Sequence, residues 1–487
     1  MQTNHTCKEN EHLLNPPIQL PLPKEFHIKT RQLLSQAMHQ QHKLPANSIA
    51  LFKSEITKPI QDQDIEETPQ QEANFHYLFG AQETDCYGIV DFDTSQAIMF
   101  CPNIPEAYEI WMVVNRQSYF KQTYAINDCF YVEELNKYLE EKKPSEIHLY
   151  DGENSDSGLR PSLPTFDFLE KYKIVKHQLY HTLNELRTIK HPEEIEQLMF
   201  INKISSDAHV RVMQNTYPHL KEYQMESLFK FHVQERCGSK AKAYDCICAS
   251  GQGNATLHYN ANTKLIADNC LILNDMGSKY NGYCSDITVT FPSNGKFTQK
   301  QKHIYQAVYE AYKNVLDNVK EGVQWDDMHL LAEKTILKHL INIGIVVNAP
   351  MEELIEKRIG AVFFPHGLGH FIGLCVHDVG GYNPGHPERH SQAGLKNLRT
   401  RRTLQAGNCI TVEPGCYFKE LIIEKALNNQ EQCKYLVKEK IEEYKEVGGV
   451  RLEDGICITK TGYINFTNVP RTIEEVEKAC AGLHWKN

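Results

Sequence analysis

The sequence contains no apolar run approaching the roughly 20 residues that cross a bilayer, and no long run of lysine or arginine. The first absence argues against a membrane protein. The second, together with a formal net charge of −10, disfavours nucleic acid as a partner. The N-terminal stretch is polar and proline-rich and lacks the apolar core of a signal peptide, so we expect a cytoplasmic protein.

A pair of cysteines spaced as CxxC is also missing. The fifteen cysteines are an odd number and are scattered along the chain, several of them inside apolar stretches such as Ile247-Cys248-Ala249. This pattern predicts buried free thiols in a reducing compartment.

Length and composition fit a soluble globular protein of two or three domains. The chain has 487 residues, of which 41% are hydrophobic and 23% charged. We predict a loose tail over 1–16, a mixed α/β domain over 17–188 and a second domain over 189–487. The second boundary rests on Pro192, which suits the first turn of a helix and is followed by two glutamates at the positive end of that helix.

The two domains differ in their predicted elements. In the first, CYGIVDFDTSQAIMFC alternates in polarity as a hairpin does, and IHLYDG is typical of a buried strand. In the second, the predicted helices lie near 220–236, 299–318, 325–343 and 350–358. They alternate with antiparallel strands near 244–250, 270–291, 363–378, 408–418 and 448–459. The predicted fold class is therefore α+β rather than doubly wound.

Five residues of metal-ligand type stand in the second domain, each in a local context that suits coordination. They are Asp275, Asp286, His370, Glu413 and Glu453. Four carboxylates and one imidazole suit a pair of divalent cations, and a metal pair in a carboxylate cage is typical of hydrolytic enzymes. Taken singly, each acid has the alternative of being an ordinary solvated strand residue.

A hairpin brings the two aspartates to one face of a ribbon. Asn281-Gly282 predicts a two-residue type I′ turn. The register that follows places Asp275 opposite Thr288, with Asp286 two residues from Thr288 on the same side. The two carboxylates would then lie one diagonal step apart, which suits two ions about 3.5–4 Å apart.

His366 and His370 lie in PHGLGH, four residues apart. The spacing is that of the zinc-protease motif HExxH, but the glutamate after the first histidine is missing and two glycines argue against a helix. We therefore expect an irregular, strand-like segment that directs His370 inward.

The two glutamates follow apolar strand patterns. Glu413 ends such a strand, and Pro414-Gly415 stops it. In VRLEDGICI, alternation puts Arg451 and Glu453 on one face, so that Arg451 would lie beside the ligand carboxylate of Glu453 and orient it. An ordinary cross-face ion pair is the alternative.

Taken together, these segments resemble the pita-bread metallopeptidases, and within them the prolidases. The likeness runs from about residue 20 to 483. It is carried, in order, by NFHYLFG, ETDCYGIVDFDT, LRTIKHPEEIE, NKISSDAH, KEYQMESLF, the LHY segment, SDITVTFPSNGKFT, PHGLGHFIG, VHDVGGY, LRTRRTLQAG, TVEPGCYF, GGVRLEDGICIT and VPRTIEEVE. The resemblance implies an N-terminal domain of the aminopeptidase-P/creatinase type followed by a pita-bread catalytic domain.

The resemblance also implies roles for individual residues. The five candidate ligands match the family's positions for two divalent ions, for which manganese is favoured. His258, His377 and His366 match histidines around the substrate, and His258 or His377 would stabilise developing charge. Arg399 matches a contact to the C-terminal carboxylate, and Arg451 the residue beside the last ligand. The activity implied is hydrolysis of Xaa-Pro dipeptides by a hydroxide shared between the ions, with Glu413 as proton carrier.

A homodimer is implied as well. In the family, a tryptophan of the N-terminal domain approaches the site of the other subunit, and Trp111 matches it. Judged by its neighbours Ile110 and Met112 alone, Trp111 would instead be a core residue.

Two alternatives come from other branches of the same fold. Aminopeptidase P acts on longer peptides with proline second, and the Arg399 segment favours the dipeptidase over it. A metal-free relative, either a binding module or an enzyme like creatinase, predicts broken ligand positions. All five positions are intact here.

Overall fold

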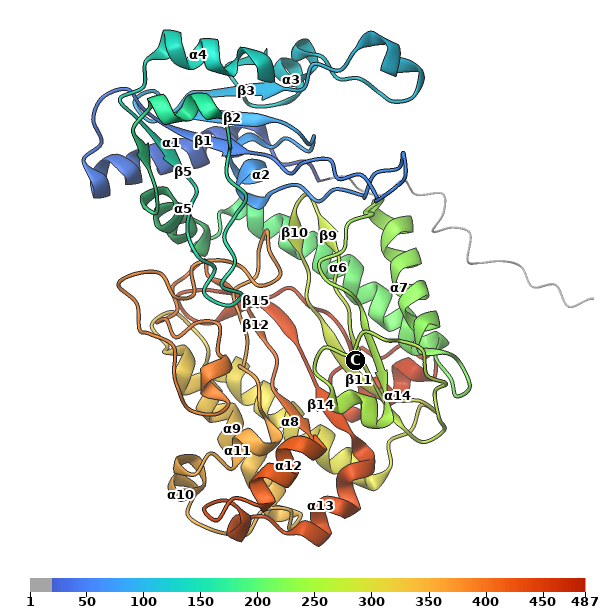
Figure 1. Cartoon of the computed structure of the whole chain (residues 1–487). Helices are drawn as coiled ribbons and strands as arrows, with labels where there is room; N and C mark the ends of the chain where they lie inside the picture. The colour runs from blue at the N-terminus through green and yellow to red at the C-terminus, as the bar shows by residue number, and fades with distance from the viewer. Residues whose placement is uncertain (1–19, 487) are drawn as a thin grey trace, which may run out of the picture.

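The computed structural model describes residues 20–486 and shows two parts, one above the other in Figure 1. We name them the N-terminal part, residues 20–188, and the C-terminal part, residues 189–486. The tail predicted for 1–16 lies outside the described residues, and the exact domain boundary stays a prediction. None of the helices between residues 20 and 486 is long and apolar enough to cross a membrane.

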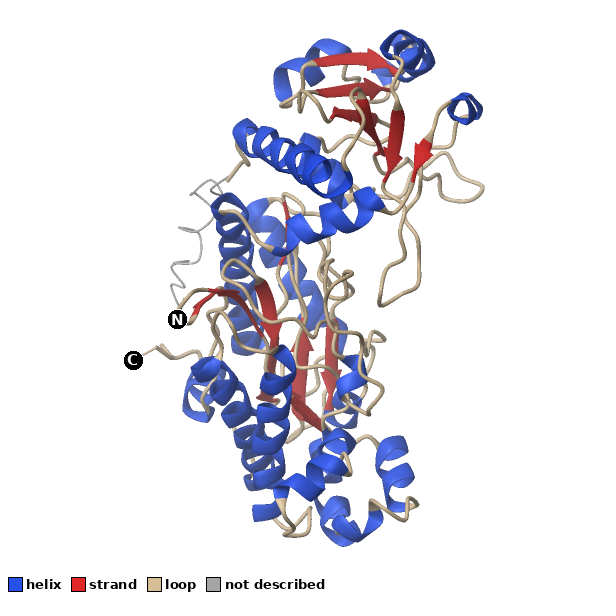
Figure 2. Cartoon of the chain, turned by 90° about the vertical axis from the view of Figure 1, so that its left-hand side faces the viewer, coloured by secondary structure: helices blue, strands red, loops and turns tan. Residues whose placement is uncertain are grey.

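One six-stranded sheet, in the order β4-β3-β2-β1-β5-β6, forms the centre of the N-terminal part. β1 pairs antiparallel with β2 and parallel with β5, so the sheet is mixed. Figure 2 shows it at one end of the molecule with helices beside it. The strands are β1 Ser48–Lys53, β2 Tyr87–Asp91, β3 Ala97–Cys101, β4 Asp128–Tyr131, β5 Glu146–Leu149 and β6 Ile174–Val175. The α-helices are α1 Lys24–His42, α2 Ala73–Phe79, α3 Gln117–Thr123, α4 Leu135–Lys142 and α5 Gln178–Thr188.

The predicted hairpin in this sheet is confirmed. β2 and β3 pair antiparallel across the turn. The Asp91 carboxylate accepts hydrogen bonds from the backbone N–H groups of Asp93 and Thr94, both at 3.0 Å, and Ser95 takes the left-handed conformation with φ 56°. The predicted buried strand is β5, which is buried along its whole length.

Two buried histidines connect α1 with α2. His27 Nδ1 lies 3.0 Å from the carbonyl oxygen of Tyr77, and the rings of His27 and His76 are 6.0 Å apart. Burial lowers the pKa of His27 to about 4 and that of His76 to about 3, so both are neutral in the folded protein near pH 7.

These histidines predict a loss of stability in mild acid. An unfolded histidine titrates near 6.5, so between that pH and about 4 the unfolded chain binds more protons, and the free energy of unfolding falls as the pH falls. From pH 7 to pH 4.5, His27→Gln should lose less stability than the wild type, by up to about 3 kcal/mol in the free energy of unfolding. Its melting temperature, measured across this pH range, should therefore decline less steeply. The exposed His484, changed to Gln, is the control. Parallel curves for His27→Gln and the wild type would contradict the assignment.

The C-terminal part alternates helices with short antiparallel strands, as the α+β prediction requires. Its helices are α6 Pro192–Asn215, α7 Glu222–Cys237, α8 Gln299–Asn318, α9 Trp325–Asn342, α10 Met351–Glu356, α11 Gly360–Phe363, α12 Glu420–Leu427, α13 Lys438–Tyr444 and α14 Ile473–Cys480. Its strands are β7 Ile247–Ser250, β8 Leu271–Asp275, β9 Lys279–Tyr280, β10 Tyr283–Cys284, β11 Thr288–Pro292, β12 Cys409–Val412, β13 Gly415–Tyr417, β14 Gly449–Arg451, β15 Asp454–Ile458 and β16 Tyr463–Asn465.

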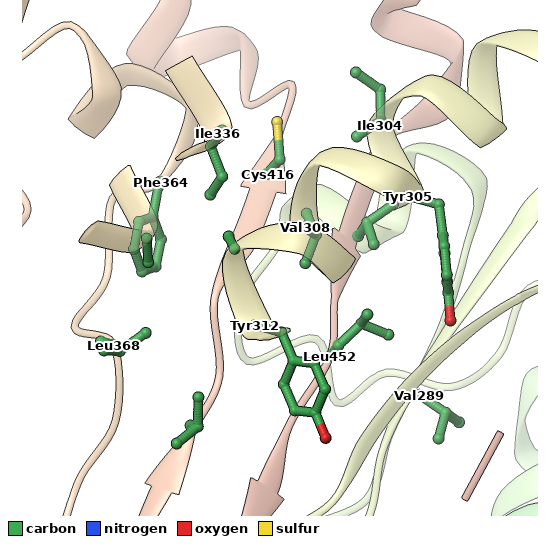
Figure 3. Close-up of a cluster of buried hydrophobic side chains, with 14 of the residues drawn as sticks. Val289, Ile304, Tyr305, Val308, Tyr312, Ile336, Phe364, Leu368, Cys416 and Leu452 are labelled. Carbon is green, nitrogen blue, oxygen red and sulfur yellow. The ribbon is translucent and has the colours of Figure 1, made fainter. Parts of the chain in front are cut away.

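A large apolar core supports these strands from behind. α8 packs against β12, β13 and β14, and α14 packs against β11. Figure 3 shows Val308 and Tyr312 of α8 beside Val289 of β11 and Leu452, which directly follows β14. Val308, Val289 and Leu452 are almost completely buried. Burying each such side chain contributes about 1.5–3 kcal/mol to folding stability. The core therefore keeps in place the strand ends that carry the candidate ligands.

One predicted element is wrong. The strand expected over 363–378 is replaced by α11 and an irregular segment, with a single bridge between Phe371 and Ile410. Pro365, which lacks an N–H, and the glycines at 367 and 369 prevent a regular strand here.

The cysteines of residues 20–486 are all free, and most of them are buried. This confirms the expectation of buried thiols for the part of the chain that the structure describes.

Candidate metal centre

The hairpin at Asn281-Gly282 has the predicted register. Asn281 and Gly282 both have positive φ, 44° and 83°, as a type I′ turn requires. Asp275, the last residue of β8, pairs with Thr288, the first residue of β11. Asp286 precedes β11 by two residues, and its carboxylate shares a hydrogen-bond partner with that of Asp275.

The partner that Asp275 and Asp286 share is the hydroxyl of Tyr244. It lies 2.6 Å from Oδ1 of Asp275 and 2.6 Å from Oδ1 of Asp286. A hydroxyl has one hydrogen to donate, so it cannot satisfy two ionised carboxylates at once. Burial, with the charge of Asp275, raises the pKa of Asp286 well above its usual range. The pair therefore calls for a proton or a cation.

His370 lies on the irregular segment that follows α11. The backbone N–H groups of Thr411 and Glu413 donate to the carbonyl oxygens of His370 and Leu368, at 2.9 and 2.8 Å, so the segment runs antiparallel to β12. A Cβ on Gly369 would lie 1.9 Å from the carbonyl oxygen of Thr411, so only glycine fits there. The predicted irregular, strand-like arrangement is confirmed, and it directs His370 inward.

The His370 ring presents a lone pair to three carboxylates. Its Nδ1 lies 3.0 Å from the carbonyl oxygen of Phe371, which can only accept, so Nδ1 carries the hydrogen. Burial lowers the pKa of His370, which keeps the ring neutral. Its Nε2 then faces carboxylate oxygens of Asp286 at 3.4 Å, Glu413 at 3.5 Å and Glu453 at 4.0 Å. Electron pairs opposed at these distances suit a cation between them, and the Nδ1 contact is the one that metal-ligating histidines make.

The two glutamates complete an electron-rich cage. Glu413 directly follows β12, and Glu453 lies between β14 and β15, 1% exposed. Burial and the charge of Glu453 raise the pKa of Glu413 to about 8. Burial and the charge of Asp286 raise the pKa of Glu453 well above its usual range. Ligand atoms of Asp286, His370 and Glu453 all lie within 4.8 Å of one another, so this donor set fits a divalent cation.

Arg451 has a different partner from the predicted one. Its Nη2 donates to Asp275 Oδ2 at 2.6 Å, across the strands, rather than to Glu453. It reaches Glu453 only through Thr288, whose hydroxyl donates to Glu453 Oε2 at 2.7 Å and lies 3.1 Å from Arg451 Nε. The alternation of VRLEDGICI fails here because β14 ends at Arg451 and β15 begins after Glu453.

A cleft of about 920 Å³ opens over the cage, and the remaining predicted histidines line it. His366 contacts the Tyr417 hydroxyl at 2.8 Å, and burial lowers its pKa to about 3. Burial lowers the pKa of His377 to about 2, and it lowers that of His258. Neutral imidazoles can give or take a hydrogen bond, which suits contacts to a peptide.

Arg399 lines the same cleft and adds positive charge at its rim. The structure therefore brings together ten of the eleven predicted site residues, all but Trp111. They are Asp275, Asp286, His370, Glu413, Glu453, Arg451, His258, His366, His377 and Arg399. Tyr244, which the sequence did not single out, joins them.

Trp111 does not line the cleft of its own chain among the residues that the structure describes there. It follows a short 3-10 helix, Glu106–Ile110, in the N-terminal part. Its side chain is 83% exposed, and its neighbours Ile110 and Val113 are as open. The placement in a core, suggested by its neighbours alone, is therefore wrong, because this stretch lies on a surface loop.

The comparisons with known proteins agree with this geometry. Residues 196–460 match the model of metallopeptidase family M24, and residues 27–150 match that of the aminopeptidase P N-terminal domain. The chain belongs to metallopeptidase family M24. It is 38% identical to the Xaa-Pro dipeptidases of Mus musculus and Homo sapiens, over 95% of this chain and 94% of each relative.

Solved structures show the same fold. Aminopeptidase PepP of Pseudomonas aeruginosa superposes with a TM-score of 0.78 at 27% identity, covering 95% of this chain and 99% of the other. Zinc-substituted aminopeptidase P of Escherichia coli, in complex with product, gives 0.76 at 26% identity over the same shares. The predicted pita-bread architecture with its N-terminal domain is confirmed, and the protein is a metallopeptidase that uses divalent metal ions.

Several residues of the site escaped the sequence analysis. Tyr244 connects the two aspartates, and Tyr417 contacts both His366 and Arg451. Asp156 reaches the cleft from the N-terminal part. No local signal marks these residues, because each acts on a partner distant in the sequence.

Proposed function

We propose that this protein is a dipeptidase that hydrolyses Xaa-Pro dipeptides to a free amino acid and proline, using a pair of divalent cations. One observation carries the proposal most directly. The lone pair of His370 Nε2 faces three carboxylates in a cleft that neutral histidines and Arg399 also line. The likeness to the Xaa-Pro dipeptidases over 95% of the chain supports the substrate class.

The ligands we assign to the ions are Asp275, Asp286, His370, Glu413 and Glu453. When bound, such a pair supplies positive charge that lowers the pKa of a shared water toward neutrality and polarises the scissile carbonyl group. Manganese is our choice of metal because the donor set is rich in oxygen and the family resemblance favours it. Arg451 holds Asp275 in place by the 2.6 Å ion pair.

Glu413 is our candidate for the proton carrier. It lies on the cleft wall, where its Oε2 is 3.8 Å from Nδ1 of His366. A carboxylate so placed takes a proton from the attacking water and gives it to the prolyl nitrogen. That nitrogen leaves poorly until it is protonated, so the transfer is needed.

The substrate itself is held by the rim of the cleft. Arg399 suits a peptide's terminal carboxylate, which a guanidinium can hold with two parallel hydrogen bonds. His258 and His377, both neutral, suit the scissile carbonyl oxygen as negative charge develops on it. The nitrogen of an Xaa-Pro bond carries no hydrogen, so it cannot donate a strand-like hydrogen bond. Recognition must therefore rest on the contacts to the terminal carboxylate and to the scissile carbonyl oxygen.

The direct test compares Gly-Pro with Gly-Pro-Gly on the manganese-loaded enzyme. We expect Gly-Pro to be the better substrate. Arg399→Ala should lower kcat/KM for Gly-Pro by about a hundredfold, in line with the 1.5–3 kcal/mol of a charged hydrogen bond, and should spare the tripeptide. Arg401→Ala is the control, since Arg401 pairs with Asp326 instead. Preference for the tripeptide would favour aminopeptidase P activity, to which the similar solved structures point.

We further propose a homodimer in which Trp111 approaches the partner's cleft. The exposed apolar stretch that includes Ile110 and Val113 supports this, because surface runs of that kind mark interfaces.

The free thiols between residues 20 and 486 support a cytoplasmic location. We place the domain boundary between residues 188 and 189, where α5 ends and the connection to α6 begins.

A further inference from the structure

A loop of the N-terminal part enters the cleft of the C-terminal part. Asn154 Oδ1 accepts hydrogen bonds from the backbone N–H groups of Asp156 and Ser157, at 3.0 and 2.9 Å. Asn154 also donates its own N–H to the carbonyl oxygen of Leu159 at 2.9 Å, and Gly158 turns the chain with φ 70°. The loop is thus folded on itself, and Asp156 projects from it into the cleft lining.

Two arginines of the C-terminal part form ion pairs with the Asp156 carboxylate. Arg399 Nη1 lies 3.1 Å from Oδ2, and Arg389 Nη2 donates to Oδ1. Arg389 is itself held in place, because its Nη1 donates to the carbonyl oxygen of Leu398 at 2.6 Å and its guanidinium lies over the ring of Tyr382 at 4.3 Å. Asp156 is only 20% exposed at its side chain. The loop is therefore fastened at the edge of the cleft.

Arg399 is shared between this contact and the cleft interior. Arg399, His258 and His377 line the same cleft. Burial is the main cause of the lowered pKa of both histidines, and the positive charge of Arg399 adds to it. Asp156 satisfies one side of the guanidinium and leaves positive charge for a single further anion. Two arginines and one aspartate together carry one net positive charge, which matches one peptide carboxylate.

We propose that Asp156 is a specificity-determining residue that restricts the cleft to peptides ending at proline. The inference rests on the proposed dipeptidase function, in which Arg399 binds the prolyl carboxylate. A peptide that continues past proline has no carboxylate at Arg399 and must run into the loop that holds Asp156. There Ser155 and Asp156 are part of the cleft lining, so they obstruct the longer peptide, and the aspartate repels its terminal carboxylate. Discrimination against a competing substrate by a built-in clash and a like charge is a common device.

The test uses Asp156→Ala, which removes bulk and charge, and Asp156→Asn, which removes charge alone. The manganese-loaded enzymes are assayed with Gly-Pro and Gly-Pro-Gly. We expect kcat/KM for the tripeptide itself to rise in Asp156→Ala, so that the ratio of kcat/KM for the tripeptide to that for the dipeptide rises about tenfold, and by a smaller factor in Asp156→Asn. Asp245→Asn is the matched control, because Asp245 lines the same cleft but is exposed and paired with Lys242. Its ratio should equal that of the wild type.

Two outcomes would overturn the proposal. A ratio within twofold of the wild type, in variants that still hydrolyse Gly-Pro and melt at the wild-type temperature, means that Asp156 does not select for length. A lower kcat/KM for Gly-Pro with an unchanged kcat/KM for Gly-Pro-Gly means that Asp156 only positions Arg399. Failure of the wild type itself to hydrolyse Gly-Pro would reject the dipeptidase proposal first, and this inference with it, so the two failures are distinguishable.

Discussion

Glu453→Gln is expected to lower kcat for Gly-Pro by at least about a thousandfold, or about 4 kcal/mol of transition-state stabilisation. The glutamine keeps an oxygen to accept the 2.7 Å hydrogen bond from Thr288, but it removes the charge that we assign to metal binding. Metal content per chain, measured by elemental analysis on the same samples, should fall together with kcat.

A second measurement separates a metal ligand from a structural residue. Burial and neighbouring acids raise the pKa of Glu453 well above its usual range, so its ionised form destabilises the metal-free protein. The chelated Glu453→Gln variant should therefore melt at or above the temperature of the chelated wild type at pH 8. Glu443→Gln, at an exposed glutamate paired with Lys440, controls for loss of charge. Near-wild-type turnover, or a lower melting temperature without a loss of metal, would remove Glu453 from the site.

Asp378→Ala is expected to cost about 3–5 kcal/mol of folding stability, the usual effect of breaking a buried ion pair by removing one partner. Asp378 lies beside His377, and its two oxygens contact Arg187 Nη2 at 2.6 Å and Lys190 Nζ at 2.8 Å. The three side chains are 1–2% exposed. Removing the carboxylate leaves two buried positive charges without their shared partner.

Urea unfolding followed by tryptophan fluorescence measures this loss, with Trp325 as a fully buried reporter. Asp317→Asn is the matched control. Asp317 pairs with Lys313 at the surface, with both side chains more than half exposed, so its loss should change stability by less than about 1 kcal/mol. Because Arg187 belongs to the N-terminal part and Asp378 to the C-terminal part, the Asp378 variant should loosen the contact between the two parts as well. A change below about 1 kcal/mol in Asp378→Ala would show that the pair is not needed for stability.

Local chemistry explains why much of the site could be predicted. Asn281-Gly282 permits few backbone conformations, so the turn fixed the register that sets Asp275 opposite Thr288. Few residue types bind divalent cations, so acids and a histidine within apolar strand patterns predict a metal site without knowledge of any tertiary contact. The glycines around His370 excluded a helix, and the structure shows the irregular segment that they imply.

Contacts between distant segments explain what could not be predicted. The strand expected over 363–378 does not form, and Arg451 pairs with Asp275 rather than with Glu453. Strand alternation predicts which side chains share a face only while the strand is continuous, and the break between β14 and β15 lies at this site.

The donor set, the hairpin register, the α+β class and the family follow from the amino-acid sequence alone, because residue type and turn chemistry act over a few positions. Three features are visible only in the folded chain: the Tyr244 hydroxyl contacts two acids, Trp111 is exposed, and Asp156 pairs with Arg399. These facts depend on packing between segments far apart in the chain. Packing is a sum of many weak contacts, which no single stretch of sequence encodes.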